Sequence, residues 1–180
     1  MKKNKVVFKG TEISVQDVVQ IDETSMGKAH KYHKGKYTKR RWCFGISQPC
    51  EHKCFIMLVD KRDEATLLNM NDEPNSEMHI VSDGWAAYNN LSSAGYRHST
   101  VIHKTEFKNK EEQTTNSIES VWFQFKTWIN AMHELRKGYY KDYMDEFMFR
   151  YNMCKGNRND CIEPFLAHLR HYQGFKVEDE

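Results

Sequence analysis

Val18-Val19-Gln20-Ile21-Asp22 is the stretch that most directly indicates how this chain folds. Its β-branched residues favour a buried strand, and an acid stands at the end of the run. A second run of the same kind follows at Met78-His79-Ile80-Val81-Ser82-Asp83. Two apolar strands that each end in a carboxylate predict a sheet with acidic groups at the tips of its strands.

The other predicted elements lie around these two runs. Residues 41–46 and 54–59 predict strands that would form an antiparallel meander with the first run, and residues 100–103 predict a fifth strand. Short helices are predicted over residues 64–70 and 84–93. From residue 116 onward, apolar residues recur at spacings of three and four, which predicts helices over 116–129, 139–151 and 162–172.

This order of elements predicts one α/β domain, because strands alternate with helices and a helical region follows. The order is that of an RNase H-like fold: a mixed five-stranded sheet flanked by helices, with extra C-terminal helices. We expect residues 1–17 to be an N-terminal tail, residues 18–173 the domain, and residues 174–180 a C-terminal tail. Fold alone does not give a function.

The composition of the 180 residues is that of a folded protein with a polar surface. The hydrophobic content of 39% and the aromatic content of 13% exclude a disordered chain, and the mean hydropathy is −0.82. Lys and Arg number 27 against 25 Asp and Glu, which gives a formal net charge of +2. The partner must therefore be indicated by local clusters of charge.

Neither a membrane span nor a signal peptide is predicted. No apolar run approaches the roughly 18 residues that a membrane helix needs, and the basic start at residues 1–5 precedes no apolar stretch. The five cysteines lack the density of a secreted disulfide framework, so we expect reduced thiols. The expected location is the nucleus in a eukaryote, or the cytoplasm and nucleoid in a bacterium. The cysteines are Cys43, Cys50, Cys54, Cys154 and Cys161.

Three acids are the candidate catalytic and metal-binding residues. Asp22 and Asp83 each close a predicted strand, and Glu119 stands early on the longest amphipathic helix. Oxygen ligands of this kind suit two Mg²⁺ or Mn²⁺ ions, which activate a nucleophile and stabilise the leaving oxygen of a phosphate. The alternative is that both aspartates form turns and that Glu119 is a solvated helix residue.

The spacing of these acids and the sequence motifs around them are specific. Thirty-five residues separate Asp83 from Glu119, and Lys126 follows Glu119 by seven. The surrounding motifs are Ile21-Asp22-Glu23-Thr24, Ser82-Asp83-Gly84-Trp85-Ala86-Ala87-Tyr88 and Thr115-Asn116-Ser117-Ile118-Glu119-Ser120-Val121-Trp122. Together they resemble the DDE pattern of transposases and integrases, and most closely Merlin-type transposases and related bacterial insertion-sequence (ISXO2-like) transposases.

The resemblance spans about residues 19–169, and it also shows two departures from the family pattern. Thr114 stands where family members usually carry a histidine, and the zinc-binding, DNA-recognising region of many members is not found before Asp22. In some relatives the third ligand is an asparagine, so Asn116 is an alternative to Glu119. We favour Glu119, because an anionic ligand binds the metal more strongly.

The candidate DNA-binding residues are basic and lie near the acids in sequence. Seven of these candidates lie between residues 28 and 41, where tyrosines are interleaved with the basic residues, a composition that suits DNA binding. The alternative interpretation of this stretch is a solubilising loop. This set consists of Lys28, Lys31, Lys34, Lys36, Lys39, Arg40, Arg41 and Lys126. His98 and His103 flank the fifth predicted strand and are candidates for supporting the metal site. A zinc site at residues 50–54 is not expected, because a second ligand pair is lacking.

The resemblance implies a DNA transposase catalytic core that cleaves phosphodiester bonds at transposon ends and transfers the strand into target DNA. It also implies a homodimer or larger synaptic assembly, because two ends must be paired. Two alternatives remain open. One is a domesticated or degenerate core that binds DNA or protein without catalysis, which Thr114 favours. The other is an RNase H-like nuclease, which would share the fold and the metals.

Overall fold

The computed structural model describes nine stretches of the chain, and everything below concerns these residues. They are residues 5–8, 11–14, 18–26, 41–60, 79–101, 114–132, 139–154, 161–163 and 166–167. The helix predicted over 64–70 lies outside them. Within these stretches we find no helix with the length and apolar character of a membrane span.

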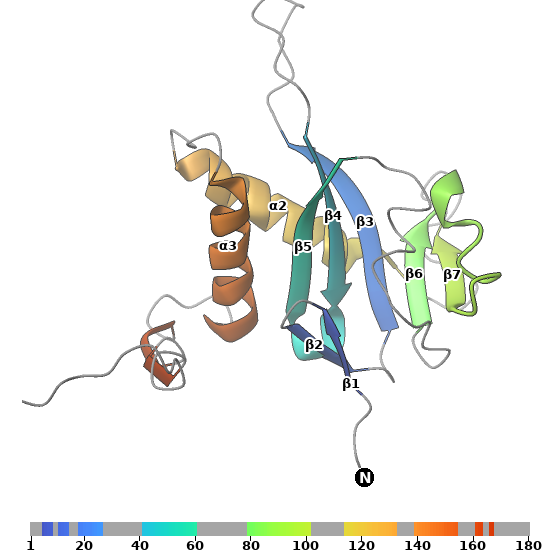
Figure 1. Cartoon of the computed structure of the whole chain (residues 1–180), viewed down its shortest axis with the longest axis horizontal. Coiled ribbons are helices and arrows are strands. Elements are labelled where there is room, and N and C mark those ends of the chain that lie inside the picture. Colours follow the sequence, from blue (N-terminus) through green and yellow to red (C-terminus); the bar gives the residue numbers. More distant parts are fainter. Residues whose placement is uncertain are drawn as a thin grey trace, which may run out of the picture.

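A five-stranded mixed sheet forms the centre of the molecule (Figure 1). Its order is β5-β4-β3-β6-β7. The first three strands in sequence, β3 (Val18–Met26), β4 (Arg41–Gln48) and β5 (Lys53–Val59), pair antiparallel. The strands β6 (His79–Asp83) and β7 (Arg97–Val101) continue the sheet in parallel with β3. The predicted meander and the mixed five-stranded sheet are confirmed.

The two faces of this sheet carry separate cores. Residues alternate between the faces along a strand, so Val19 and Ile21 of β3 pack on one face with Tyr88. On the other face, buried residues of β4 and β5 pack against Ile118 and Phe125. Gln20, Asp22, Thr24 and Met26 belong to this second face by alternation. Asp22 therefore points toward the helices rather than toward the first core.

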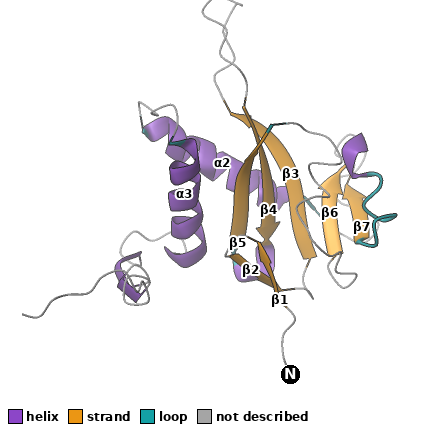
Figure 2. Ribbon diagram, viewed as in Figure 1, coloured by secondary structure: helices purple, strands orange, loops and turns teal. Residues whose placement is uncertain are grey.

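Two helices cover that second face (Figure 2). They are α2 (Asn116–Ala131) and α3 (Tyr140–Cys154), close to the predicted ranges. The apolar residues of α2 at spacings of three and four are the buried ones, Ile118, Val121, Trp122, Phe125 and Ile129. Helical residues at 162–163 and 166–167 follow α3.

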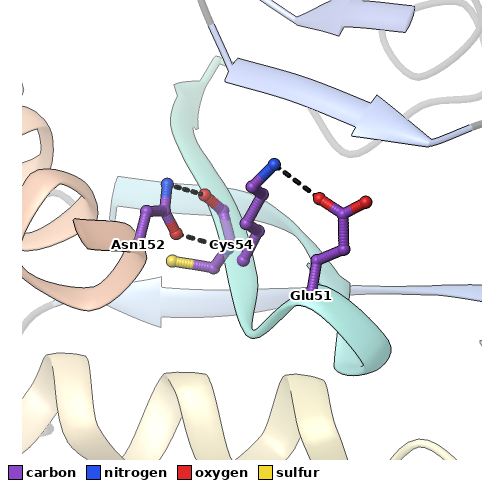
Figure 3. Close-up of polar contacts among 4 residues, drawn as sticks. Glu51, Cys54 and Asn152 are labelled. Atoms are coloured by element: carbon purple, nitrogen blue, oxygen red, sulfur yellow. Dashed lines mark hydrogen bonds and ion pairs between the residues drawn. The ribbon is translucent and has the colours of Figure 1, made fainter. Parts of the chain in front are cut away.

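Strand β5 lies at one edge of the sheet. Helix α3 packs along this strand and covers the edge. The side chain of Asn152 accepts a hydrogen bond from the Cys54 amide at 2.7 Å and donates to the Cys54 carbonyl at 2.9 Å (Figure 3). One turn earlier, Met148 Sδ accepts from the Ile56 amide at 3.0 Å. These contacts satisfy backbone groups that would otherwise offer a pairing edge to another chain. Beside them, Lys53 pairs with Glu51 at 2.6 Å.

Several predicted boundaries are wrong. The strand β3 does not end at Asp22 but continues to Met26, because residues 23–26 pair with β4. The helix predicted over 84–93 is only the short 3-10 helix η3 (Ala86–Tyr88) followed by turns. The last strand lies at Arg97–Val101 instead of 100–103. A second short helix, η2 (Pro49–Glu51), joins β4 to β5.

Two further features were not predicted. The expected tail contains β1 (Lys5–Phe8) and β2 (Thr11–Ser14), which form a separate antiparallel pair. The prediction that all five cysteines are reduced is wrong for Cys154 and Cys161, which form a disulfide. The end of α3 and the helical residues after it bring their Cα atoms to 4.8 Å, within disulfide reach. Cys43, Cys50 and Cys54 form no disulfide within the part of the chain that the structure describes.

Candidate active site

Asp22 lies in the middle of β3, half-buried, on the face that α2 covers. It stands directly opposite Gly45 of β4. Its Oδ2 accepts a hydrogen bond from the indole nitrogen of Trp122 at 3.0 Å. The carboxylate is therefore surrounded by two strands and a helix before any ligand is considered.

Burial raises the pKa of Asp22 to about 6. A backbone hydrogen bond at Glu23 and the Trp122 indole oppose this shift, because both stabilise the charged form. The negative charges of Asp83 and Glu119 raise the pKa further. Asp83 and Glu119 are thus both close enough to Asp22 to act on its charge.

Asp83 ends β6, the strand next to β3 in the sheet. Val81 is in register with Gln20, so by alternation Asp83 lies on the same face as Asp22. The backbone amide of Trp85 donates to Asp83 Oδ1 at 3.1 Å, which fixes the carboxylate at the start of the turn. Two carboxylates therefore project from neighbouring strands toward α2.

The serine before Asp83 joins this strand end to β7. Ser82 is fully buried, and its hydroxyl donates to the Asp83 carbonyl at 2.9 Å. Because that hydroxyl has one proton, His98 Nε2 must donate in the 2.8 Å contact with Ser82. Burial and the nearby His79 lower the pKa of His98, which suits a neutral ring. His98 thus supports the strand end that carries Asp83, from the opposite face of the sheet.

Glu119 and Asn116 are exposed residues of the first turns of α2. This helix start is fixed to β3 by Gln20, whose Oε1 accepts from the Ser117 amide at 2.9 Å and from the Ile118 amide at 3.0 Å. The first amides of a helix have no partner within the helix, so Gln20 acts as a cap supplied by the sheet. Gln20 and Asp22 stand two residues apart on one face, which brings the Glu119 turn to Asp22.

A second contact reinforces the docking of α2. The hydroxyl of Ser117 lies 2.7 Å from that of Ser47, a fully buried residue of β4. The start of the helix is therefore bonded to two adjacent strands of the sheet. These bonds fix the turn of α2 that carries both Asn116 and Glu119, and Glu119 is close enough to act on the charge of Asp22.

The donor set fits a divalent cation. Within the described stretches no three His, Cys, Asp or Glu side chains are already gathered at metal-binding spacing. Burial raises the pKa of Asp22, and repulsion by the carboxylates of Asp83 and Glu119 raises it further. A cation such as Mg²⁺ or Mn²⁺ would replace this repulsion by attraction, and carboxylate oxygens are the ligands that such ions take. The assignment of Asp22, Asp83 and Glu119 as ligands stays a prediction.

The structure describes only two of the predicted DNA-binding residues. Lys126 is half-buried on α2, and its charge lowers the pKa of the Cys43 thiol, although burial raises that pKa to about 12 overall. Lys126 therefore lies near Cys43, which is two residues before Gly45 on β4. Arg41 is exposed and stacks over the ring of Tyr140 at 4.2 Å. The other six basic residues of the set and His103 lie outside the described residues.

Sequence reasoning missed the residues that hold the acids in place. Gln20 was visible as a polar residue inside an apolar strand, a position that is unfavourable unless the side chain is bonded. Gly45 was visible as a glycine inside a strand, which often marks a close approach by another group. The contact between Trp122 and Asp22 gave no local signal, because 100 positions separate the two residues.

Comparison with known proteins gives the family and the fold of the chain. A family model described as the ISXO2-like transposase domain matches residues 14–152. No match was found among curated proteins. Among solved structures, the chain is similar to the catalytic core domain of BIV integrase, with 11% identity and a TM-score of 0.55 over 86% of this chain and 97% of that one.

Two further structures are similar at lower scores. One is a simian T-cell lymphotropic virus intasome in complex with the PP2A regulatory subunit B56 gamma, with 12% identity and a TM-score of 0.49 over 75% of this chain and 48% of that one. The other is the HTLV-2 integrase catalytic core domain in complex with magnesium, in its dimeric form. It has 13% identity and a TM-score of 0.44 over 75% of this chain and 84% of that one.

The fold and the site define the class of protein. A mixed sheet of five strands with this order, similar to an integrase catalytic core, is an RNase H-like fold, as predicted. The family model places this domain among the transposases. The chain belongs to the ISXO2-like transposase domain family, whose model covers more than half of its length.

Proposed function

We propose that this chain is a DNA transposase catalytic core that cleaves a phosphodiester bond at each transposon end and transfers the freed 3′ end into target DNA. The observation that carries the proposal is the meeting of three acids from three elements. Asp83 and Glu119, on β6 and α2, both act electrostatically on Asp22 in β3. Membership of a transposase family supports this reaction type.

Asp22, Asp83 and Glu119 would hold two Mg²⁺ or Mn²⁺ ions. When bound, such ions activate a water or a 3′-hydroxyl and stabilise the leaving oxygen of the phosphodiester. The chain's own contribution is to hold the carboxylates in place. The Trp85 amide fixes the Asp83 carboxylate, and Gln20 fixes the helix that carries Glu119.

DNA is the proposed substrate and partner. We assign phosphate contacts to Lys126 and to the basic residues between 28 and 41, which follow β3 in sequence, since several lysines and arginines together neutralise the DNA backbone. Arg41 begins β4, opposite Met26 at the end of β3. A homodimer or larger synaptic assembly would pair the two ends, in a bacterial nucleoid or a eukaryotic nucleus.

Within the family we further propose a Merlin-type relationship. It is supported by the sequence motifs around Asp22, Asp83 and Glu119. The motifs around Asp83 and Glu119 are long enough to be specific. The motif around Asp83 makes specific contacts in this structure. The Trp85 amide bonds Asp83, and Tyr88 is buried with its hydroxyl donating to Glu23 of β3. The loop after Asp83 is thus tied to the strand that carries Asp22.

A strand-transfer assay tests the proposal. Labelled duplexes carrying the element's ends are incubated with a plasmid target, Mg²⁺ or Mn²⁺, and either the wild type, Asp83→Asn or the control Asp145→Asn, an exposed residue of α3. We expect wild type and control to cut and join. Asp83→Asn should lose at least about 100-fold in rate, because it weakens the ligand set.

The other outcomes separate the alternatives. Cutting without joining would favour an RNase H-like nuclease. DNA binding without either reaction, in the wild type and in Asp83→Asn alike, would favour the non-catalytic core that Thr114 suggests. Equal activity of wild type and Asp83→Asn would exclude Asp83 from the site.

A further inference from the structure

The indole of Trp122 is the feature from which a further role follows. Trp122 belongs to α2, one turn after Glu119, and only 5% of its surface is exposed. Residues three apart on a helix are neighbours on one face. From this position its Nε1 donates to Asp22 Oδ2 at 3.0 Å. One side chain therefore connects the helix of one proposed ligand with the carboxylate of another.

Gly45 makes this approach possible. It stands opposite Asp22 in the ladder between β3 and β4. A Cβ added at Gly45 would lie 2.5 Å from Cζ2 and 2.6 Å from Cη2 of the Trp122 ring, and 3.1 Å from Ile118 Cδ1. The first two distances are too short for any real contact, and a buried indole has little freedom to move away. The ring thus occupies the space of a missing side chain, directly beside Asp22.

The chemistry of the indole suits a carboxylate that must also bind a cation. An ionised carboxylate offers about four lone-pair sites, and the indole N–H uses one of them on Oδ2. The donor is neutral at all relevant pH values, so it restrains the carboxylate without adding a positive charge that would compete with an ion. A lysine or arginine in the same place would compete in that way.

We propose that Trp122 is a positioning residue for the metal site, which holds the Asp22 carboxylate in one orientation and fixes α2 relative to it, and that Gly45 is required for this contact. The inference rests on the proposed function, because it takes Asp22 and Glu119 as ligands. Removing a hydrogen bond that orients a metal ligand weakens metal affinity by about 10- to 100-fold. We expect this range for loss of the indole N–H.

Mn²⁺ affinity, measured by calorimetry on the full chain without DNA, tests the proposal directly. Trp122 is replaced by 3-benzothienylalanine, which has the same ring shape but sulfur in place of the N–H, and in parallel by Phe (Trp122→Phe). The matched control is Trp128→Phe on the same helix, whose ring packs on Phe125, Tyr143 and Phe147. Both changes at 122 should weaken Mn²⁺ binding by about 10- to 100-fold, whereas the control should not.

A second set of variants tests the role of Gly45. Gly45→Ala should weaken Mn²⁺ binding in the wild-type background, because its methyl group displaces the indole. In the Trp122→Phe background the same change should do little further harm, because the smaller ring lacks the atoms that would clash and the hydrogen bond is already absent. Raising the Mn²⁺ concentration should restore strand transfer in the benzothienylalanine variant, a rescue that a purely structural role would not give.

The outcomes distinguish this inference from the proposed function. If the wild type binds Mn²⁺ and Asp83→Asn abolishes that binding, the proposed site stands. Should the benzothienylalanine variant then bind Mn²⁺ as tightly as the wild type, the role of Trp122 is overturned while the proposed function remains. Absence of Mn²⁺ binding by the wild type would overturn both.

Discussion

At the scale of single residues, Asp22 stands in an environment that opposes its charge. Burial raises its pKa from 3.8 to about 6, and two further acids add to the shift. An acidic group whose pKa is raised on folding stabilises the folded state when the group is protonated. In the metal-free protein, the stabilisation from Asp22 is therefore complete below pH 3.8 and is lost as the pH rises through about 6.

This linkage predicts a pH-dependent difference between the wild type and Asp22→Asn. Without metal, the free energy of unfolding of the wild type relative to that variant should fall between pH 4 and pH 8, by roughly 2.5 kcal/mol if the whole shift is expressed. Urea unfolding in the presence of a chelator, at a series of pH values, measures this difference. Parallel profiles for the two proteins would contradict the prediction. Saturating Mn²⁺ should reduce the difference at pH 8, because a bound cation favours the charged carboxylate.

At the same scale, the sequence indicated the three acids but not their supporting side chains. Two acids followed apolar runs, the third stood early on an amphipathic helix, and all three had the spacing of the family, so each could be found by reading along the sequence. The contacts of Gln20 with α2 and of Trp122 with Asp22 join residues about 100 positions apart. Only the folded chain brings such residues together, so no window of sequence could indicate them.

At the scale of elements, α2 depends on β3 for its N-terminal cap. Thr115 at the N-cap makes no side-chain capping bond, and Gln20 accepts from two of the first amides instead. Gln20→Met keeps the length of the side chain but removes the acceptor, so two amides lose their partner. We expect a loss of about 1–3 kcal/mol in the free energy of unfolding, with weaker Mn²⁺ binding.

The matched control for this change is Gln124→Met on the exposed side of the same helix, where Gln124 bonds to Ser120 one turn earlier. Urea unfolding of the two variants and the wild type gives the comparison. The control should lie within a few tenths of a kcal/mol of the wild type, as is usual for exposed positions. Equal stability of the two variants would show that the cap from β3 contributes nothing.

The contact between α3 and β5 gives a second prediction for an element. Asn152→Ala removes both bonds to the Cys54 backbone at the edge of the sheet. We expect a loss of about 1–3 kcal/mol in unfolding free energy and faster hydrogen exchange at the Cys54 amide. Met153→Ala, a change at the exposed neighbour, is the control. Unchanged exchange at Cys54 would show that the amide is protected in another way.

The elements themselves differ in how well they could be predicted. Strands β3 to β6 and helices α2 and α3 show long apolar patterns, and the structure has each of them. The segment after Asp83 was predicted as a helix, although its Asn89-Asn90 and Ser92-Ser93 pairs favour turns. There the Asp83 carboxylate bonds the Trp85 amide, and Tyr88 is buried against the sheet. These tertiary contacts favour a turn and a short 3-10 helix over a regular helix.

For the molecule as a whole, the mixed sheet explains why two acids meet although they are far apart in sequence. β3 and β6 are parallel neighbours, so their carboxyl ends point the same way, and the helix that follows β7 in the described chain returns to the same face. The order of strands and helices was enough to predict this architecture. The docking of α3 along β5 was not predictable, because the side chains that cover an edge leave no periodic pattern in the sequence.

Glu23 follows Asp22 directly, so two acids occupy adjacent positions whose side chains face opposite sides of the sheet. A slip of β3 by one residue would exchange them, and the misregistered sheet would still present a carboxylate toward α2. Acidity alone would therefore not distinguish the right pairing from this decoy. The distinction comes from the neighbours, because the slip would move Gln20 away from the amides of α2 and place Glu23, which is longer, where the indole meets Asp22. The contacts that support the site thus also favour the native register of β3 in the sheet.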